Sequence, residues 1–275
     1  MHAAEYHFIR DLVYQHSRIN LGSDKRELVS ARLAKRLRAI RVPGVTAYCD
    51  LLRSPNGQEE LGHLIDAIST NHTYFFREED HFSALGDLIL PELEQRRERE
   101  RWPQLRIWSA ACSSGEEPYS IAIFLAERFR QRPLWPWQIE ATDISRRILK
   151  RAEQGVYARD ALTRVPRHLL KTYFETGYGP QDGNHRVRAA LRERVRFHYL
   201  NLLEGPPPFP AGFQVIFCRN VMIYFDRPTQ QELVERLSRL LVPGGYLLVG
   251  HSESLTGINH PLKLVRPATY RSPGP

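Results

Sequence analysis

The sequence predicts two parts, an all-helical N-terminal part and an α/β part built on a mostly parallel sheet with covered faces. In residues 1–85, apolar side chains recur at helical spacing and no strand pattern is present. From Leu105 onward, short apolar runs alternate with helix patterns, as in sheets whose parallel strands are joined by helices. The chain has 275 residues, 42% of them hydrophobic, and a net charge of +8. This composition excludes wholesale disorder, and no apolar run is long enough to cross a membrane.

The N-terminal part is expected to contain four helices. In the second of them, Val29, Leu33 and Leu37 form an apolar stripe, and the basic residues fall mostly off that stripe. The turn-forming pair Pro43 and Gly44 marks the end of this helix. The predicted helices cover residues 6–17, 25–41, 45–52 and 59–68.

The α/β part is expected to contain four strands and three helices, with one interruption. In residues 159–195, turn-forming residues separate short strand-like runs, and we expect an inserted small β element there. Residues 132–137 are expected to form a loop before the second strand. The predicted strands cover residues 106–111, 138–141, 213–218 and 246–250, and the predicted helices cover residues 116–130, 145–153 and 228–241.

The expected domains are a helical one at residues 1–85 and an α/β one at residues 105–275, with the β insertion at about residues 160–195. A linker with a charged helix end would join them at residues 86–104. Three cysteines lie far apart, without a CxxC pair or the ligand spacing of a zinc site. The N-terminus is polar and lacks the apolar core of a signal peptide. We therefore expect reduced thiols, no metal and a cytoplasmic protein.

Residues 110–117, which follow the first predicted strand, form the first candidate site. A strand that turns sharply into a helix through small residues such as Gly115 lets the backbone approach a ligand closely. The GxGxxG pattern of dinucleotide sites is absent, and Glu116 and Glu117 at the helix start would repel a pyrophosphate. The loop suits a ligand with cationic character and no phosphate. Alternatively, the two acids only complement the helix dipole.

Asp143, at the end of the second predicted strand, is the second candidate. In doubly wound sheets, ligands bind outside the carboxyl ends of the strands, and an acid there accepts hydrogen bonds from ribose hydroxyls. Alternatively, Asp143 caps the next helix together with Ser145. The loop and the acid together indicate a nucleoside ligand without phosphate. S-adenosylmethionine meets this description, because it has a ribose, a sulfonium cation and no phosphate.

Six segments of unusual composition occur in order along most of the chain. They lie at residues 70–78 (TNHTYFFRE), 108–120 (WSAACSSGEEPYS), 141–145 (ATDIS), 201–203 (NLL), 216–226 (IFCRNVMIYFD) and 250–254 (GHSES). Together they resemble the CheR-type chemotaxis receptor methyltransferases. The resemblance implies a Rossmann-like S-adenosylmethionine-dependent methyltransferase domain with a small β insertion, preceded by an all-helical domain. It also implies methyl transfer to glutamate side chains of chemoreceptors, with S-adenosylhomocysteine as the product.

The resemblance further implies which residues contact the cofactor. Of the two acids at the helix start, the order of the motif favours Glu116 over Glu117. His251 in the last motif is interpreted as a structural polar residue at a strand end. The predicted cofactor contacts are Asn71, Thr73, Arg77, Gly115, Glu116, Asp143, Asn201, Leu202, Arg219 and Asn220.

Arg77 and Tyr224 are the predicted catalytic residues. A glutamate carboxylate, with a pKa of about 4.3, is already ionised at neutral pH, so the transfer needs no general base. It needs in-line alignment and partial dehydration of the nucleophile. Arg77 would orient a carboxylate through its planar fork, and Tyr224 would offer a hydroxyl near the reacting atoms. Alternatively, Tyr224 is an aromatic core residue.

The basic helix at residues 25–41 is expected to steer an acidic partner, such as a chemoreceptor helical bundle. Its charges would also suit the phosphates of RNA or DNA, but exposed aromatic residues for base stacking are not obvious, so we expect no nucleic-acid partner. We also expect no membrane insertion. The alternatives are a nucleic-acid methyltransferase and a module that binds S-adenosylmethionine without turnover. The resemblance suggests that the β element binds a receptor C-terminal peptide by edge-strand addition. The basic residues in question are Arg32, Lys35, Arg36 and Arg38.

Overall fold

The structure is a computed structural model that describes residues 1–55, 57–130 and 135–274. Its core is a seven-stranded sheet in the order β6-β2-β1-β7-β8-β10-β9. The first five strands in this order are parallel to their neighbours, and β10 and β9 run antiparallel at one edge. The strands are β1 (Leu105–Ala110), β2 (Trp137–Asp143), β6 (Val195–Tyr199), β7 (Phe213–Cys218), β8 (Leu241–Val249), β9 (Lys263–Arg266) and β10 (Thr269–Arg271).

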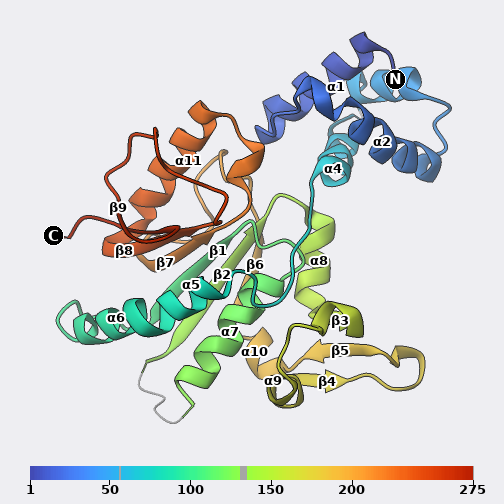
Figure 1. Cartoon of the computed structure of the whole chain (residues 1–275). Coiled ribbons are helices and arrows are strands. Elements are labelled where there is room, and N and C mark those ends of the chain that lie inside the picture. The colour runs from blue at the N-terminus through green and yellow to red at the C-terminus, as the bar shows by residue number, and fades with distance from the viewer. Residues whose placement is uncertain (56, 131–134, 275) are drawn as a thin grey trace.

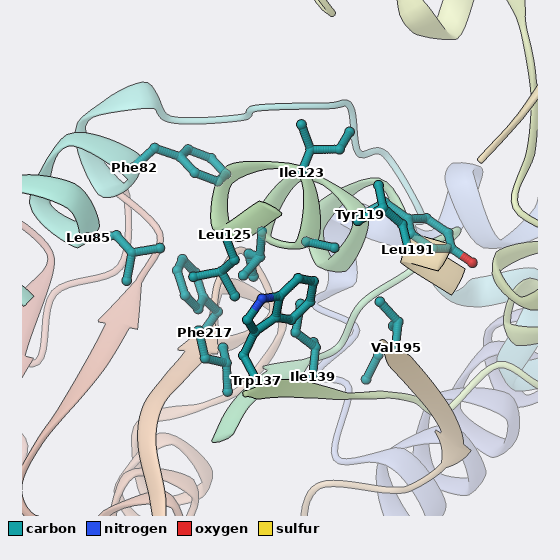
Figure 2. Packing of buried hydrophobic residues seen from close by; sticks show 14 of the residues in the cluster. Phe82, Leu85, Tyr119, Ile123, Leu125, Trp137, Ile139, Leu191, Val195 and Phe217 are labelled. Atoms are coloured by element: carbon teal, nitrogen blue, oxygen red, sulfur yellow. The ribbon is translucent and has the colours of Figure 1, made fainter. Parts of the chain in front are cut away.

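Both faces of the central strands β1, β2, β7 and β8 are buried, because these parallel strands carry apolar side chains on both faces. On one face, Ile107 and Phe217 belong to a cluster that includes Leu125 of helix α7 (Figure 2). On the other face, Ile216 packs in a second cluster with Leu237 of α11. The helices that contact the sheet include α7 (Glu116–Arg128), α8 (Arg146–Gln154), α10 (Ala189–Arg192) and α11 (Arg227–Leu240).

The N-terminal part consists of helices, as the sequence predicts, and lies to one side of the sheet (Figure 1). It has its own core, in which Ile9, Val13, Leu33 and Leu64 are fully buried. Ile144, which follows β2, packs against this core and joins the two parts. The elements are α1 (Ala3–Ser17), the 3-10 helix η1 (Ser23–Lys25), α2 (Arg26–Ile40), α3 (Val45–Arg53) and α4 (Gly57–Ile68).

The described side chains of residues 79–97 contribute to the hydrophobic cluster on the sheet and not to the cluster of the N-terminal helices. Phe82 and Leu85 lie in the same cluster as the side chains of α7 (Figure 2), whereas the N-terminal cluster ends at Ile68. We therefore propose that the domains divide at about residues 69–74, earlier than expected, and that residues 86–104 belong to the α/β domain. The segments concerned are α5 (Glu79–Ala84), the π-helical turn η2 (Leu85–Ile89) and α6 (Leu90–Arg97).

A second sheet of three antiparallel strands, in the order β3-β5-β4, is inserted between α8 and β6 (Figure 1). The small β element expected from the turn residues is therefore present, and its first strand begins at Val156. The elements of this insertion are β3 (Val156–Ala158), η3 (Arg159–Leu162), α9 (Arg167–Tyr173), β4 (Phe174–Thr176), η4 (Gly179–Gln181) and β5 (Asn184–Val187).

The structure also contains elements that the sequence pattern did not predict. These include α5, β6, β9 and β10, and the last predicted strand is the end of the longer β8. Of the expected loop at residues 132–137, residues 132–134 lie outside the described residues, and Trp137 already begins β2. Within the described residues, no helix has both the length and the apolar character to span a membrane.

Candidate active site

A cavity lies at the carboxyl ends of β1, β2, β6 and β7. Its space is about 1070 Å³, counting the open mouth. The lining comes from the end of α1, the segment before α5, single residues of α5 and of the start of α7, and the chain just after each of these four strands. Parallel α/β sheets bind ligands at this edge, because the loops that follow the strands converge there. The cavity is therefore the candidate site for a small ligand.

Most of the residues predicted from the sequence meet in this cavity. Two of them, Gly115 and Glu116, do not line it, and Glu117 does. The nine predicted residues that line the cavity are Asn71, Thr73, Arg77, Asp143, Asn201, Leu202, Arg219, Asn220 and Tyr224.

Gly115 shapes the loop after β1 without facing the cavity. Its φ of +94° lies in the left-handed region that side chains disfavour. A Cβ at this position would also come 2.8 Å from the Tyr157 hydroxyl and 3.0 Å from the Cβ of Ala152. The Tyr157 hydroxyl donates to the Ser114 carbonyl at 2.7 Å. Gly115 is therefore needed for close packing of the loop against the small sheet and α8.

The two acids at the start of α7 point to different places. Glu116 accepts a hydrogen bond from Ser114 Oγ at 2.6 Å, outside the cavity. Glu117 lines the cavity, accepts a hydrogen bond from Ser109 Oγ at 2.7 Å and pairs with Arg219 Nη1 at 3.2 Å. Burial raises the pKa of the Glu117 carboxyl, and the charge of Arg219 opposes this rise. Glu117 and not Glu116 therefore lines the cavity, and we propose Glu117 in place of Glu116 as the acid of this pair that faces the ligand.

Asp143 ends β2 and presents a buried carboxylate at the cavity. Its two oxygens accept backbone N–H groups of Ser113 and Ser145, both at 2.9 Å. Burial raises the pKa of Asp143 to about 6, although these two hydrogen bonds favour the charged form. Ser145 is the residue that caps α8, since its hydroxyl accepts the N–H of Ile148. Asp143 therefore holds the loop after β1 and retains acceptor capacity toward the cavity.

The segment before α5 forms another wall of the cavity. It is anchored by Phe75, a fully buried ring whose centroid lies 4.9 Å from that of Tyr157 and 5.7 Å from that of Phe174. Arg77 donates to the carbonyl of His72 at 3.0 Å and lies over the ring of Tyr74. Its guanidinium is therefore held at the cavity by neighbours in its own segment.

Arg219, just after β7, is the centre of a buried charge network. It pairs with Glu78 Oε2 at 3.0 Å as well as with Glu117, and it donates to the carbonyl of Arg77. Asn220 Nδ2 donates to the other oxygen of Glu78 at 3.2 Å. Burial opposes ionisation of Glu78, but contact with His81 and the charge of Arg219 outweigh it and hold the pKa of Glu78 well below its usual range.

The helical domain completes the cavity from the opposite side. Asn201 Nδ2 donates to the carbonyl of His16 at 2.8 Å, and the N–H of Asn20 donates to the carbonyl of Tyr224 at 2.8 Å. Tyr14 Oη donates to Asp226, the residue that caps α11, at 2.6 Å. The end of α1 is therefore tied to both chain segments that carry the last predicted site residues.

Glu78 was not predicted as a site residue, although it ends the first of the quoted motifs. Its charge close after an aromatic run is the only hint in the sequence. It meets Arg219 across 141 positions of the chain, and its αL backbone, with φ 57°, turns the chain into α5. Neither feature follows from local spacing.

The residues of the cavity fit S-adenosylmethionine. Asp143 offers carboxylate oxygens to ribose hydroxyls, which donate well to ionised acceptors. Ile144 and Leu200 supply apolar surface for a base. Two acids at the start of α7 disfavour a phosphate there, and the charge of Arg219 is balanced by Glu78 and Glu117. A ligand with a cationic centre and no phosphate suits this electrostatic arrangement.

One further group of titratable residues adjoins this network. Within the described part of the chain, the ligand atoms of Glu78, His81 and His251 lie within 4.8 Å of one another, close enough for a metal ion. The guanidinium of Arg219 contacts the same Glu78 carboxylate and opposes a second cation there. Burial lowers the pKa of His81, which disfavours its charged form.

Two family models match the chain. A model described as CheR methyltransferase, all-alpha domain, matches residues 4–69, and one described as CheR methyltransferase, SAM binding domain, matches residues 71–270. A chemotaxis protein methyltransferase from Borreliella burgdorferi is 41% identical over 94% of this chain and 91% of its own length. Chemotaxis protein methyltransferase 2 from Pseudomonas aeruginosa is 41% identical over 97% and 92%, and that of Escherichia coli is 40% identical over 97% and 90%.

Proposed function

The chain belongs to the CheR methyltransferase family, and we propose that its cavity binds S-adenosylmethionine for methyl transfer to glutamate side chains of a chemoreceptor. The protein is an S-adenosylmethionine-dependent methyltransferase of the protein-glutamate type. The products would be glutamate methyl esters and S-adenosylhomocysteine. The single observation that carries the assignment to this cavity is the convergence of nine predicted residues on one sheet edge.

Binding of the donor would rest mainly on Asp143 and Glu117. Asp143 would accept ribose hydroxyls, while Glu117 and its partner Arg219 would face the charged amino acid end of the donor. The donor supplies an activated methyl group on a sulfonium cation. The role of the chain is to hold that cation among balanced charges and to exclude water from it.

In the transfer step, the substrate carboxylate needs orientation and not deprotonation, because it is ionised at neutral pH. Arg77 lines the cavity and is placed to pair with that carboxylate. Its guanidinium donates to the backbone carbonyl of His72, and this neutral partner does not compensate its charge. Tyr224 also lines the cavity and offers its hydroxyl. Positioning two reacting groups in this way can lower the barrier by up to about 7–11 kcal/mol.

The receptor would dock on α2 through its exposed basic residues. Two of the four predicted residues have partners within the helical domain, because Arg36 pairs with Glu60 at 2.5 Å and Arg32 donates to Thr70 at 2.8 Å. Lys35 and Arg38 are exposed and present their charge to solvent. We therefore narrow the proposed docking surface to Lys35 and Arg38, which would steer an acidic helix bundle toward the cavity.

The small sheet would bind a receptor C-terminal peptide. Its order places β3 and β4 at the two edges, where unpaired backbone groups are available for strand addition. The residues Glu175 and Thr176 of β4 are exposed. We further propose that the protein works in the cytoplasm, where its three buried free cysteines would stay reduced.

The test is transfer of a tritiated methyl group from the donor into purified chemoreceptor cytoplasmic fragments. We expect label that mild base releases, as a carboxyl ester requires, and loss of labelling when the receptor glutamates are replaced by alanine. Labelling of RNA in place of the receptor fragments would overturn the proposal. Binding of the donor without any transfer would identify a sensing module instead.

A further inference from the structure

Glu253, in the last of the quoted motifs, has a buried carboxylate whose two oxygens each accept two backbone N–H groups. Its Oε2 accepts the N–H of Asn220 at 2.7 Å and that of Gly250 at 2.6 Å. Its Oε1 accepts the N–H of Met222 at 2.7 Å and that of Ile223 at 3.3 Å. Glu253 thus fastens the chain after β7 to the chain after β8, and three of its four donors belong to the segment that carries Asn220 and Tyr224.

The segment after β7 needs such a fastening, because it leaves the sheet in an irregular conformation. Asn220 has a φ of 59°, in the left-handed region, and its N–H donates to a side chain and not to a neighbouring strand. Buried N–H groups without acceptors are costly, and one carboxylate accepts the buried N–H of Met222 together with the partly buried N–H groups of Asn220 and Ile223. Burial raises the pKa of Glu253, while the hydrogen bonds oppose this rise by favouring the charged form.

Gly250 makes this arrangement possible. A Cβ at residue 250 would lie 2.7 Å from Glu253 Oε2 and 2.6 Å from Asn220 Nδ2. Distances this short require the neighbours to move, so glycine at residue 250 lets the chain after β7 and the chain after β8 come this close. Gly250 and Glu253 therefore both serve the contact between the chain after β7 and the chain after β8.

We propose that Glu253 is a positioning residue of the methyltransferase, which sets the cavity-facing orientation of Asn220 and Tyr224 through their backbone. This inference rests on the proposed function, because it assumes that the donor binds against these two residues. Glu253 does not line the cavity, so it acts through the segment and not by direct contact. Glu78 also holds the same segment, through the side chains of Arg219 and Asn220.

The experiment compares Glu253→Gln with Glu140→Gln by calorimetric titration of S-adenosylhomocysteine. Glu140 is a matched control, because each residue is 6% exposed and Glu140 is hydrogen-bonded to His198 at 2.7 Å outside the cavity. The side-chain amide that Glu253→Gln introduces would place an N–H group against backbone donors, so the segment would shift. We expect the Kd to rise about 10-fold in Glu253→Gln, and kcat to fall, with the Kd of Glu140→Gln within about 2-fold of the wild type.

Two further measurements separate positioning from a general loss of stability. In ¹⁵N–¹H spectra, Glu253→Gln should move the amide signals of Asn220 and Met222 while signals of the N-terminal helices stay in place. Gly250→Ala keeps the carboxylate but crowds it, and it should weaken binding in the same direction. If the wild type itself does not bind S-adenosylhomocysteine, the proposed function fails. If the wild type binds and Glu253→Gln and Gly250→Ala bind equally well, only the positioning role of Glu253 is overturned.

Discussion

The loop after β1 and the segment after β7 reach the same cavity, but they are held by different forces. The first, at residues 110–117, is shaped mainly by steric fit around Gly115 and by neutral hydrogen bonds such as Tyr157 to Ser114, with one bond from the Ser113 N–H to the Asp143 carboxylate. The second, at residues 219–225, is held by charged groups, because Arg219 is bound by Glu78 and Glu117 and the backbone is bound by Glu253.

This difference shows that two chain segments at the carboxyl ends of the same strands respond differently to pH. A loop fixed mainly by close packing depends less on the charge of its surroundings, although Asp143 also binds this loop through the N–H of Ser113. A segment fixed by charge balances its carboxylates against a guanidinium, so its conformation depends on ionisation. Substitutions in the first should therefore change stability at every pH, whereas substitutions in the second should have effects that depend on pH.

The largest effect is expected for Arg219→Met. It leaves the carboxylates of Glu78 and Glu117 without their cation, and we expect the free energy of unfolding at pH 7 to fall by about 3–5 kcal/mol. In the wild type the pKa of Glu78 is well below its usual range, so its stabilising contribution is present above the unfolded pKa of about 4.3 and is lost progressively as the pH falls from there toward the folded-state pKa. The difference between the variant and the wild type should therefore be about 1 kcal/mol smaller at pH 3.5 than at pH 7.

Urea unfolding at pH 7 and pH 3.5 measures this difference. The control is Arg239→Met, because Arg239 is exposed and pairs with Glu235 at 3.7 Å on the surface. We expect the free energy of unfolding of the control to fall by at most about 0.5 kcal/mol. A loss in Arg219→Met that is equal at both pH values would show that the segment is held by packing after all.

The next largest effect is expected for Gly115→Ala, which tests the loop held by shape. The new Cβ would be 2.8 Å from the Tyr157 hydroxyl in a left-handed backbone conformation. We expect a loss of about 2–3 kcal/mol in the free energy of unfolding, equal at pH 7 and pH 5. Gly62→Ala in α4 is the control, because nothing lies within 4 Å of its Cβ position, and it should stabilise the helix by up to about 1 kcal/mol. An unchanged free energy of unfolding in Gly115→Ala would contradict steric control of the loop.

The same contrast explains how much of the site the sequence could predict. The loop after β1 depends on contacts of small residues in one motif, so Gly115 and the acids of α7 were recognisable, although which acid faces the cavity depends on the side of α7 that meets Arg219. Asp143 was recognisable because it ends a buried strand. Glu78 was not, because its partner is 141 positions away and no periodicity records that contact.

The fold shows the same limit. Helices α1 to α4 and the buried strands β1, β2 and β7 have strong apolar patterns, and the sequence predicted them with small errors at their ends. Strand β9 is exposed along its whole length and has no apolar alternation. It forms only because β10 offers a backbone edge to pair with. Elements that tertiary pairing creates leave no signal in the local sequence.

Asp143 lies between the two regions and should show a pH dependence of its own. Its pKa is raised to about 6, so it destabilises the free protein progressively as the pH rises from about 4 to 6, and the stability is higher below that window. Ribose hydroxyls prefer the ionised carboxylate, so affinity for S-adenosylhomocysteine should rise about 10-fold from pH 5 to pH 7 and then level off. Asp143→Asn should remove this dependence and weaken binding by about 2 kcal/mol at pH 7.

Calorimetric titration at pH 5, 6, 7 and 8 tests this dependence in both proteins. Proton release on binding, seen as heats that vary with the ionisation enthalpy of the buffer, is a second sign of the same event. A flat profile in the wild type would mean that Asp143 is not the group that titrates with binding.

Glu117 joins the two regions, because it lies in the first turn of α7 after the first loop and pairs with Arg219 of the second segment. Glu117→Gln should weaken binding of S-adenosylhomocysteine by about 1.5 kcal/mol, since it removes a charge from the cavity wall and unbalances Arg219. Glu116→Gln is the matched control on the preceding residue and should bind within about 2-fold of the wild type. If Glu116→Gln weakened binding and Glu117→Gln did not, Glu116, the acid that the motif order favours, would be the residue that contacts the ligand.

The smallest effect is expected for Tyr14→Phe, which tests whether the helical domain gives the segment after β7 a further support. The change removes only the hydroxyl that donates to Asp226 at 2.6 Å, and the N–H of Asn20 still binds the carbonyl of Tyr224. We expect the free energy of unfolding to fall by about 1 kcal/mol, and the Kd for S-adenosylhomocysteine to rise less than about 3-fold. Tyr178→Phe, at a hydroxyl on an 88% exposed side chain, is the control and should change neither quantity. If Tyr14→Phe weakened binding as much as Glu253→Gln, the orientation of the segment would depend on the helical domain as much as on its own carboxylates, and a receptor bound to α2 could then alter the affinity for the donor.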